Sequence, residues 1–505
     1  MEDLLLGIDI GTSACKVAVF RQNGTVAAQS NAVYQVDYPH AGWAQQNPDE
    51  WWEAVCRAIR DLEQQGVNLA RVVGIGVDGQ SWSAIPLDAD GKVLCPTPIW
   101  MDTRSAPQCA EMIERCGAEV LFASGGNPVQ PMYTMPKVLW YQENLPDVYR
   151  AADKILQSNS FIVFRLTGVV SQDPSQGYGW SCYDMRRGVW DRELCRQAGI
   201  EPGLLPDIVP CHAPVGNVTA QAAALTGLRI GTPVVAGGLD AACGTLGAGV
   251  VQAGQTQEQG GQAGGMSLCM DTCRMDPALI LGAHVVPELW LLQGGTVGGG
   301  GAMNWFEREF GAEERALARK NGTNSFVELD RQAERISAGS EGMVFLPYLA
   351  GERSPIWNAQ AKGVFYGASF ATGRAHFARA VMEGVAYSLR HNLEVAEKAG
   401  AKAGVLRAMG GAANSRLWTQ IKADVTGKTI EVPSSDTATA LGAAILAGMG
   451  TGVYESFAQA VERTVQVRRV HMPNPENKSV YDARYAEYRS LYERLKPLMK
   501  GDSVQ

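Results

Sequence analysis

A short polar turn near the start of the chain carries residue types suited to binding phosphate. Asp9 and Gly11 are followed by Thr12, Ser13 and then Lys16. Hydroxyl and backbone N–H donors at a glycine turn can hold phosphate oxygens, and a lysine adds positive charge. A carboxylate beside such a site makes sense if Mg²⁺ lies between it and the phosphate. An ordinary hairpin with an aspartate in its turn explains the spacing equally well, because short glycine motifs have many false positives.

Two apolar runs flank this turn and predict the strands that must position it. Residues 4–6 and 16–20 read as the arms of a β-hairpin. A second pattern of strand, glycine turn and strand occupies 257–270, about 250 residues later. The repeat predicts two domains of similar build. We expect an N-terminal domain at 1–246, a C-terminal domain at 247–475, and a terminal helix and tail at 476–505.

The composition limits the class of protein. With 505 residues the chain is too long for one hydrophobic core, so two or more domains are expected. Its net charge of −8 does not favour nucleic acid or an anionic membrane as a partner. No apolar run reaches the ~18 residues needed to span a membrane. The eleven cysteines are scattered and no secretory signal is evident, which predicts reduced thiols in a cytoplasmic protein.

A single aspartate marks a second place where chemistry is expected. An apolar strand over 232–239 ends in glycines and Asp240, and small residues continue as a helix. A carboxylate at a strand–helix junction is a candidate general base. A helix-capping aspartate accounts for the same pattern.

Two further segments suggest contacts with a polar ligand. Gln80, Ser81 and Trp82 follow the apolar strand 72–77, at the end of a strand where α/β sheets bind ligands. Trp100, Asp102 and Arg104 alternate, offering an aromatic face and two polar ends to a polyhydroxylated molecule. The alternative for this second segment is an exposed strand end with a surface ion pair.

A glycine pair in the second half of the chain suggests a nucleotide-binding turn. Gly410 and Gly411 follow an apolar strand and precede Asn414. Many α/β proteins hold a nucleotide at such a turn, although a simple left-handed turn gives the same sequence.

Four segments together resemble the FGGY carbohydrate kinases, over nearly the whole length and in the family's order. They are GIDIGTSACK at 7–16, MYTMPKVLWYQEN at 132–144, GVFYGASFATGRAHFARAVMEG at 363–384, and GGAANSRLWTQIKADVTG at 410–427. Within the family, 42–48 and 100–104 are most similar to the xylulokinases. The resemblance implies an α/β fold of two RNase H-like domains, of the actin, hexokinase and Hsp70 ATPase type, around a central cleft.

The resemblance also implies roles for individual residues. Asp240 matches the general base, and Asp9 matches the carboxylate that organises Mg²⁺ beside it, so both are expected at the metal. The residues expected to bind ATP are Gly11, Thr12, Ser13, Lys16, Gly261, Gln262, Gly300, Asn304, Gly410, Gly411 and Asn414. The residues expected at the sugar are Gln80, Ser81, Trp82, Trp100, Asp102, Arg104 and Asp240. Family members are often dimers, which implies a possible homodimer.

Three positions depart from the family pattern. The second phosphate loop is Gly-Gln-Ala-Gly at 261–264 where the family usually has Gly-Thr-Ser/Thr-Gly, so backbone N–H groups and the Gln262 amide must replace the hydroxyls. Trp82 stands where xylulokinases carry a histidine, and Ala241 stands where they carry an asparagine.

The implied activity is ATP-dependent, Mg²⁺-dependent phosphorylation of a terminal hydroxyl of a sugar, with a pentulose such as D-xylulose expected first. Ribulose, gluconate, glycerol or another polyol stay open as substrates. A non-catalytic nucleotide-binding sensor on the same fold is the alternative from another class.

Overall fold

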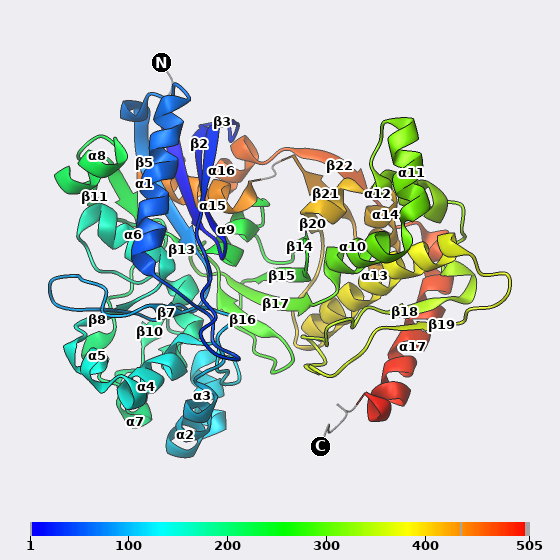
Figure 1. The fold of residues 1–505 in the computed structure, drawn as a ribbon, viewed down its shortest axis with the longest axis horizontal. Coiled ribbons are helices and arrows are strands. Elements are labelled where there is room, and N and C mark those ends of the chain that lie inside the picture. The colour runs from blue at the N-terminus through cyan, green and yellow to red at the C-terminus, as the bar shows by residue number, and fades with distance from the viewer. Residues whose placement is uncertain (1–2, 435–436, 500–505) are drawn as a thin grey trace.

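The computed structural model describes residues 3–434 and 437–499, and it has the expected mixed α/β architecture (Figure 1). Two seven-stranded sheets form its centre. The first contains β1 (Leu4–Ile10), β2 (Ala14–Arg21), β3 (Val26–Val33), β5 (Val72–Gly79), β11 (Pro214–Asn217), β12 (Pro233–Val235) and β13 (Gly238–Leu239). The second contains β14 (Thr256–Gly260), β15 (Gly264–Met270), β16 (Ile280–Ala283), β17 (Trp290–Thr296), β20 (Leu406–Met409), β21 (Ile430–Pro433) and β22 (Val467–His471).

The two sheets share one plan. In the first, β1, β2 and β3 form an antiparallel meander, β5 and β12 add parallel strands, and β11 closes the edge antiparallel. In the second, β14, β15 and β17 form the meander, β20 and β21 are parallel, and β22 is antiparallel. The predicted hairpins at both glycine turns are therefore confirmed, and they occupy equivalent places.

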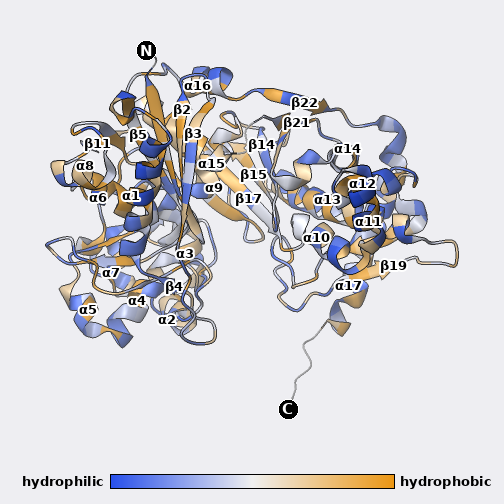
Figure 2. Ribbon diagram, turned by 45° about the horizontal axis from the view of Figure 1, so that its top comes forward, coloured by the Kyte–Doolittle hydropathy of each residue, from blue (hydrophilic) through white to orange (hydrophobic). Residues whose placement is uncertain are grey.

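Helices cover both faces of the sheets (Figure 1). Those on the outside are largely hydrophilic, whereas those between the two sheets are largely hydrophobic (Figure 2). The helices used below are α1 (Pro48–Gln64), α4 (Thr134–Asn144), α6 (Ser158–Thr167), α9 (Asp240–Gly247), α10 (Gly299–Phe310), α12 (Ser325–Ala333), α13 (Arg374–Lys398), α14 (Arg416–Thr426), α15 (Ala438–Gly450) and α17 (Lys478–Leu495). Helix α1 shows the local logic: Asn47 caps it by accepting from the Asp49 N–H, Pro48 starts it, and its apolar side is buried.

Helix α15 lies in the part of the chain expected to form the second domain, yet it packs on the first sheet (Figure 1). Glycines make this close approach possible. A Cβ on Gly7 would lie 2.0 Å from the Ala440 carbonyl oxygen, and one on Gly76 would lie 1.9 Å from the Ala443 oxygen. The domain boundary near residue 247 therefore remains a prediction. Helix α15 follows this boundary in the chain but packs on the sheet that precedes it.

Two expectations about environment can be compared with the structure. All eleven cysteines are free in the structure. Among the helices of the described ranges, none combines the length and apolar character that a membrane span requires. The tail expected after α17 lies partly outside the described residues, because the description ends at 499.

Replacing Gly76 by alanine should destabilise the protein, because the added methyl group collides with the backbone of α15. We expect a loss of about 3 kcal/mol in the free energy of unfolding, measured by urea denaturation. The matched control is Gly282→Ala in β16, where the nearest atom to the new Cβ would be 3.6 Å away. Similar losses in the two variants would contradict this account of the packing.

Candidate functional site

The turn between β1 and β2 is fixed from outside by three side chains. The Tyr34 hydroxyl donates to the Gly11 carbonyl (2.6 Å), and the Gln46 amide donates to the Thr12 carbonyl (2.8 Å). The indole N–H of Trp100 donates to the Thr12 hydroxyl oxygen (2.9 Å), so the hydroxyl hydrogen stays available as a donor. Two of the predicted residues, Thr12 and Trp100, are thus brought together.

Asp9 and Lys16 face each other across the β1–β2 hairpin, and both line a cavity of about 430 Å³. Burial raises the pKa of the Asp9 carboxyl, and the charge of Lys16 opposes that shift. The Lys16 side chain is exposed, whereas Asp9 is 8% exposed. The structure therefore places a buried carboxyl and an exposed ammonium group beside the turn predicted to bind phosphate.

Asp240 is the first residue of α9, which begins where β13 ends. One of its carboxylate oxygens accepts from the Ala241 N–H (2.6 Å), and the residue is partly accessible. Burial of the carboxyl, and then the nearby charge of Asp9, raise the pKa of Asp240 to about 7. A partly accessible carboxylate that titrates near neutrality is suited to accept a proton from a substrate hydroxyl.

A buried network that the sequence did not reveal holds the backbone just before Asp240. The Leu239 N–H donates to the Ser175 hydroxyl oxygen (2.8 Å), and Ser175 donates in turn to Asp173. Asp173 also accepts from the Asn159 amide (2.9 Å). The sequence around Asp173 carries no motif that would reveal this network, because only its tertiary partners distinguish it.

The second glycine turn makes backbone contact with the start of α10. The Gly300 N–H donates to the Gly261 carbonyl (2.7 Å), and the Asn304 amide lies 3.5 Å from the Gln262 amide oxygen. Gly410 has φ 82°, and a Cβ there would lie 3.0 Å from the Gly260 backbone. Three segments far apart in the sequence therefore meet through glycines.

These segments line one cavity of about 430 Å³. It contains six of the residues predicted to bind nucleotide: Gly261, Gln262, Gly300, Asn304, Gly411 and Asn414. Phe326, Met382 and Trp418 give it an apolar wall, and Asp330 of α12 supplies a carboxyl. Burial raises the pKa of Asp330 to about 6. Glycine turns beside an apolar wall suit the phosphates and the base of a nucleotide; the wall and Asp330 carry no motif that would have revealed them.

Trp82 anchors an aromatic cluster beside Asp240. Its ring lies 4.8 Å from that of Tyr133 and 5.4 Å from that of Tyr178. Burial raises the pKa of Tyr178, and the charge of Asp240 adds to that shift. Trp82 has φ 61°, unusual for a residue other than glycine, and its buried indole N–H has no acceptor among the described residues. Apart from this indole N–H donor and the tyrosine hydroxyls, the cluster is apolar. Ser81, which precedes Trp82, is half-buried.

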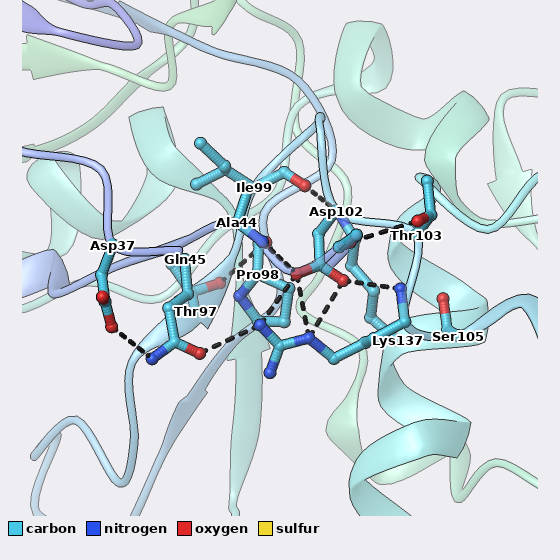
Figure 3. Close-up of polar contacts among 12 residues, drawn as sticks. Asp37, Ala44, Gln45, Thr97, Pro98, Ile99, Asp102, Thr103, Ser105 and Lys137 are labelled. Carbon is cyan, nitrogen blue, oxygen red and sulfur yellow. Dashed lines mark hydrogen bonds and ion pairs between the residues drawn. The ribbon is translucent and has the colours of Figure 1, made fainter. Parts of the chain in front are cut away.

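Asp102, Arg104 and Gln80, three of the residues expected to touch the sugar, have polar groups that bind other parts of the chain. Asp102 is fully buried and binds Arg104 (Nη2–Oδ2 2.8 Å). It also accepts from the Ala44 N–H (2.7 Å), as Figure 3 shows. The Arg104 guanidinium also donates to Gln45 and stacks 3.8 Å from the Trp43 ring centre. The pair is thus a buried structural unit, not the surface pair considered as the alternative.

Gln80 is likewise buried and donates through its amide to the Gln46 side-chain oxygen (2.8 Å). Since Gln46 in turn binds Thr12, Gln80 supports the first glycine turn.

Lys137 of α4 holds the unusual backbone at Trp82. Its buried ammonium donates to the carbonyls of Trp82 and Ile99, at 2.8 Å each. Burial lowers the pKa of Lys137 to about 7, while Asp102 opposes the shift. Lys137→Met should leave both carbonyls without this donor and cost about 2–4 kcal/mol of unfolding free energy in urea. Exposed Lys362→Met is the control; equal values for the two would refute this role.

Glu352 fixes the chain that leads into α10. It accepts from the Thr296 hydroxyl (2.5 Å) and from the N–H groups of Val297 (2.9 Å) and Arg353 (2.7 Å). Burial raises the pKa of Glu352 to about 7, although these donors oppose the shift. Because of this raised pKa, the free energy of unfolding should depend on the pH through this carboxyl.

Because the folded pKa of Glu352 lies above the unfolded value of 4.5, the folded state holds the proton more tightly. This group's contribution to stability is full below that value and is lost as the pH rises through about 7. Urea denaturation at pH 5 and 8 should show a smaller pH difference for Glu352→Gln than for wild type, by on the order of 1–3 kcal/mol. Exposed Glu114→Gln should behave as wild type; an unchanged difference in Glu352→Gln would exclude this assignment.

Comparison with known proteins points to one family. Residues 4–247 match the N-terminal domain, and 271–451 the C-terminal domain, of the FGGY family of carbohydrate kinases. The xylulose kinase of Bacillus subtilis (strain 168) is 32% identical over 497 residues, covering 98% of this chain and 97% of that protein.

Two solved structures are similar throughout. The crystal structure of xylulose kinase from Rhodospirillum rubrum has TM-score 0.89 and 31% identity, covering 98% of this chain and 99% of its own. That of gluconate kinase from Lactobacillus acidophilus has TM-score 0.89 and 26% identity, covering 98% of each. The expected fold is confirmed. The chain belongs to the FGGY family of carbohydrate kinases and is a xylulokinase-like phosphotransferase.

Proposed function

We propose that the protein transfers the terminal phosphate of ATP to a terminal hydroxyl of a neutral sugar, with a pentulose such as D-xylulose as its substrate. The observation that carries the proposal is the position of Asp240. Its partly accessible carboxylate lies within electrostatic reach of Asp9 and beside the Trp82 aromatic cluster. The proposed base Asp240, the Asp9 carboxyl beside the first glycine turn and the Trp82 aromatic cluster therefore lie near one another.

In this mechanism, Asp240 accepts the proton of the sugar hydroxyl as that oxygen attacks the phosphorus. The Thr12 hydroxyl, the turn's N–H groups and Lys16 hold phosphate oxygens on the first side. The glycine turns at Gly261 and Gly411 hold the rest of the nucleotide in the second cavity. Alignment and charge neutralisation dominate phosphoryl transfer, so these contacts supply most of the catalysis.

The residues present also fit Mg²⁺. Asp9 and Asp240 offer hard oxygen ligands beside the phosphate entrance. Within the described residues, no three His, Cys, Asp or Glu side chains are arranged to hold a metal. Phosphate and water oxygens would therefore complete the coordination of Mg²⁺, as is usual for this ion, which neutralises developing phosphate charge when bound.

The sugar is inferred from the walls around Trp82. All three rings are buried, with 3–7% of each residue exposed, so the edge of this cluster is the part that would meet the C–H faces of a sugar. These aromatic residues bring no positive charge for a carboxylate, and the guanidinium of Arg104 is already bound by Asp102. A neutral ketose or polyol is therefore favoured over an aldonate such as gluconate.

ADP release from Mg·ATP, measured across ketopentoses, pentitols, aldonates and glycerol, tests the proposal. We expect the highest kcat/KM with a ketopentose. Asp240→Asn should lower sugar-dependent release by roughly 10²–10⁴-fold, because it removes the base and one of the two carboxylates that fit Mg²⁺, while the nucleotide contacts of the second cavity retain ATP binding. Asp271→Asn, an exposed site outside the cavities described, is the control.

Other outcomes of the screen have definite meanings. Near-normal turnover by Asp240→Asn would refute the base assignment. Fastest release with an aldonate would refute the neutral-sugar inference. ATP binding without release for any sugar or polyol would favour a nucleotide-binding sensor.

A further inference from the structure

Arg353 is an exposed basic residue in the second half of the chain that the mechanism above does not use. The residues on either side of it bind the end of β17. Glu352 accepts from the Thr296 hydroxyl (2.5 Å), and the Ser354 hydroxyl oxygen accepts from the Gly295 N–H (2.6 Å). The backbone at Arg353 is therefore fixed, and its two neighbours are directed toward β17.

The Arg353 side chain extends instead to a residue of the first half of the chain. Its guanidinium carbon Cζ lies 5.7 Å from the ring centre of Trp100. The indole N–H of Trp100 donates to the Thr12 hydroxyl oxygen in the first glycine turn (2.9 Å). A guanidinium over an aromatic ring is attracted to that ring, while the N–H groups at its edge stay available for hydrogen bonds. The charge of Arg353 therefore lies beside the first glycine turn.

The second glycine turn is connected to Arg353 from the other side. Thr296, which binds the residue before Arg353, is paired in the sheet with Gly264 at the end of that turn. Gln262 and Ala263 within the turn carry no hydroxyl group. Arg353 is thus linked to both turns proposed to hold phosphate, and one of these turns lacks side-chain hydroxyl donors.

The guanidinium of Arg353 has no acidic partner within the described part of the chain. It makes no ion pair or hydrogen bond there; the hydrogen bond that Arg353 donates to Glu352 comes from the backbone N–H. The Glu352 oxygens already accept three hydrogen bonds. Arg104 provides the contrast, because Asp102 already neutralises it. An exposed guanidinium without a carboxylate can bind two oxygens of an incoming anion at once.

We infer that Arg353 binds the non-bridging oxygens of the phosphoryl group that ATP transfers, an inference that rests on the proposed function. The sugar oxygen forms a bond to the terminal phosphorus while the bond from that phosphorus to the bridging oxygen of ADP breaks. ADP leaves with the electron pair, and Asp240 takes the proton of the sugar hydroxyl. Arg353 stays protonated throughout and stabilises the negative charge on the oxygens of the group in transfer.

Calorimetric titration of the full-length protein with nucleotides, in the presence of Mg²⁺ and without sugar, tests the contact directly. Arg353→Gln should weaken the binding of a non-hydrolysable imido analogue of ATP roughly tenfold. The affinity for ADP should stay as in wild type, because ADP lacks the terminal phosphoryl group. Exposed Arg319→Gln should bind both nucleotides as wild type does. If Arg353 serves only to hold the two halves together through Trp100, both affinities should fall alike.

Steady-state kinetics give the second readout. Arg353→Gln should lower the kcat of sugar-dependent ADP release roughly 10²–10³-fold and leave the KM of the sugar near its wild-type value. Guanidinium chloride, below the concentrations that unfold the protein, should restore part of the activity of Arg353→Ala, and sodium chloride should not. Arg353→Lys, which keeps the charge but loses the planar pair of donors, should fall between wild type and Arg353→Gln.

Three results would overturn the inference. They are unchanged binding of the ATP analogue by Arg353→Gln, an equal loss of affinity for the analogue and for ADP, and a raised KM of the sugar or aldonate with unchanged kcat, which would assign the guanidinium to the acceptor substrate. The binding measurements need no turnover, so they still decide if wild type releases no ADP with any sugar. Unchanged binding of the analogue, in turn, leaves the proposed sugar kinase activity standing.

Discussion

The backbone contact of α9 and α15 with each other and with the first sheet determines where every acidic group of the site lies. A Cβ on Gly247 would lie 1.8 Å from the Ala438 oxygen, and one on Gly442 would lie 1.9 Å from the Cys243 oxygen. Such contacts leave no room for side chains between the helices. Since α9 starts with Asp240 and the sheet beneath carries Asp9 and Asp78, the close packing forces three carboxylates into one electrostatic neighbourhood.

Features set by neighbouring residues in the chain could be predicted from the sequence. Both glycine hairpins, the start of α1 at Pro48 and the start of α9 at Asp240 depend on local backbone preferences. The turns at Gly261 and Gly411 also follow from local pattern, and the structure adds that they share a cavity.

Features set by tertiary partners could not be predicted in this way. Asp102 and Arg104 alternate as ligand residues would, but Trp43 and Gln45 from another segment complete their burial. Asp78 looks like the end of one more strand until the register puts it beside Asp9. Asp330 belongs to a helix without any motif, and only the cavity gives it a role.

The packing of α15 on the first sheet limits how the chain could be divided into separate folding units. The last third of the sequence returns to cover glycines in strands laid down at its start. A gene divided near residue 247 would encode a first half whose central sheet lacks its cover. The two halves of the chain repeat one sheet plan. Because α15 from the second half packs on the first sheet, neither half contains all of the elements that its sheet packs against.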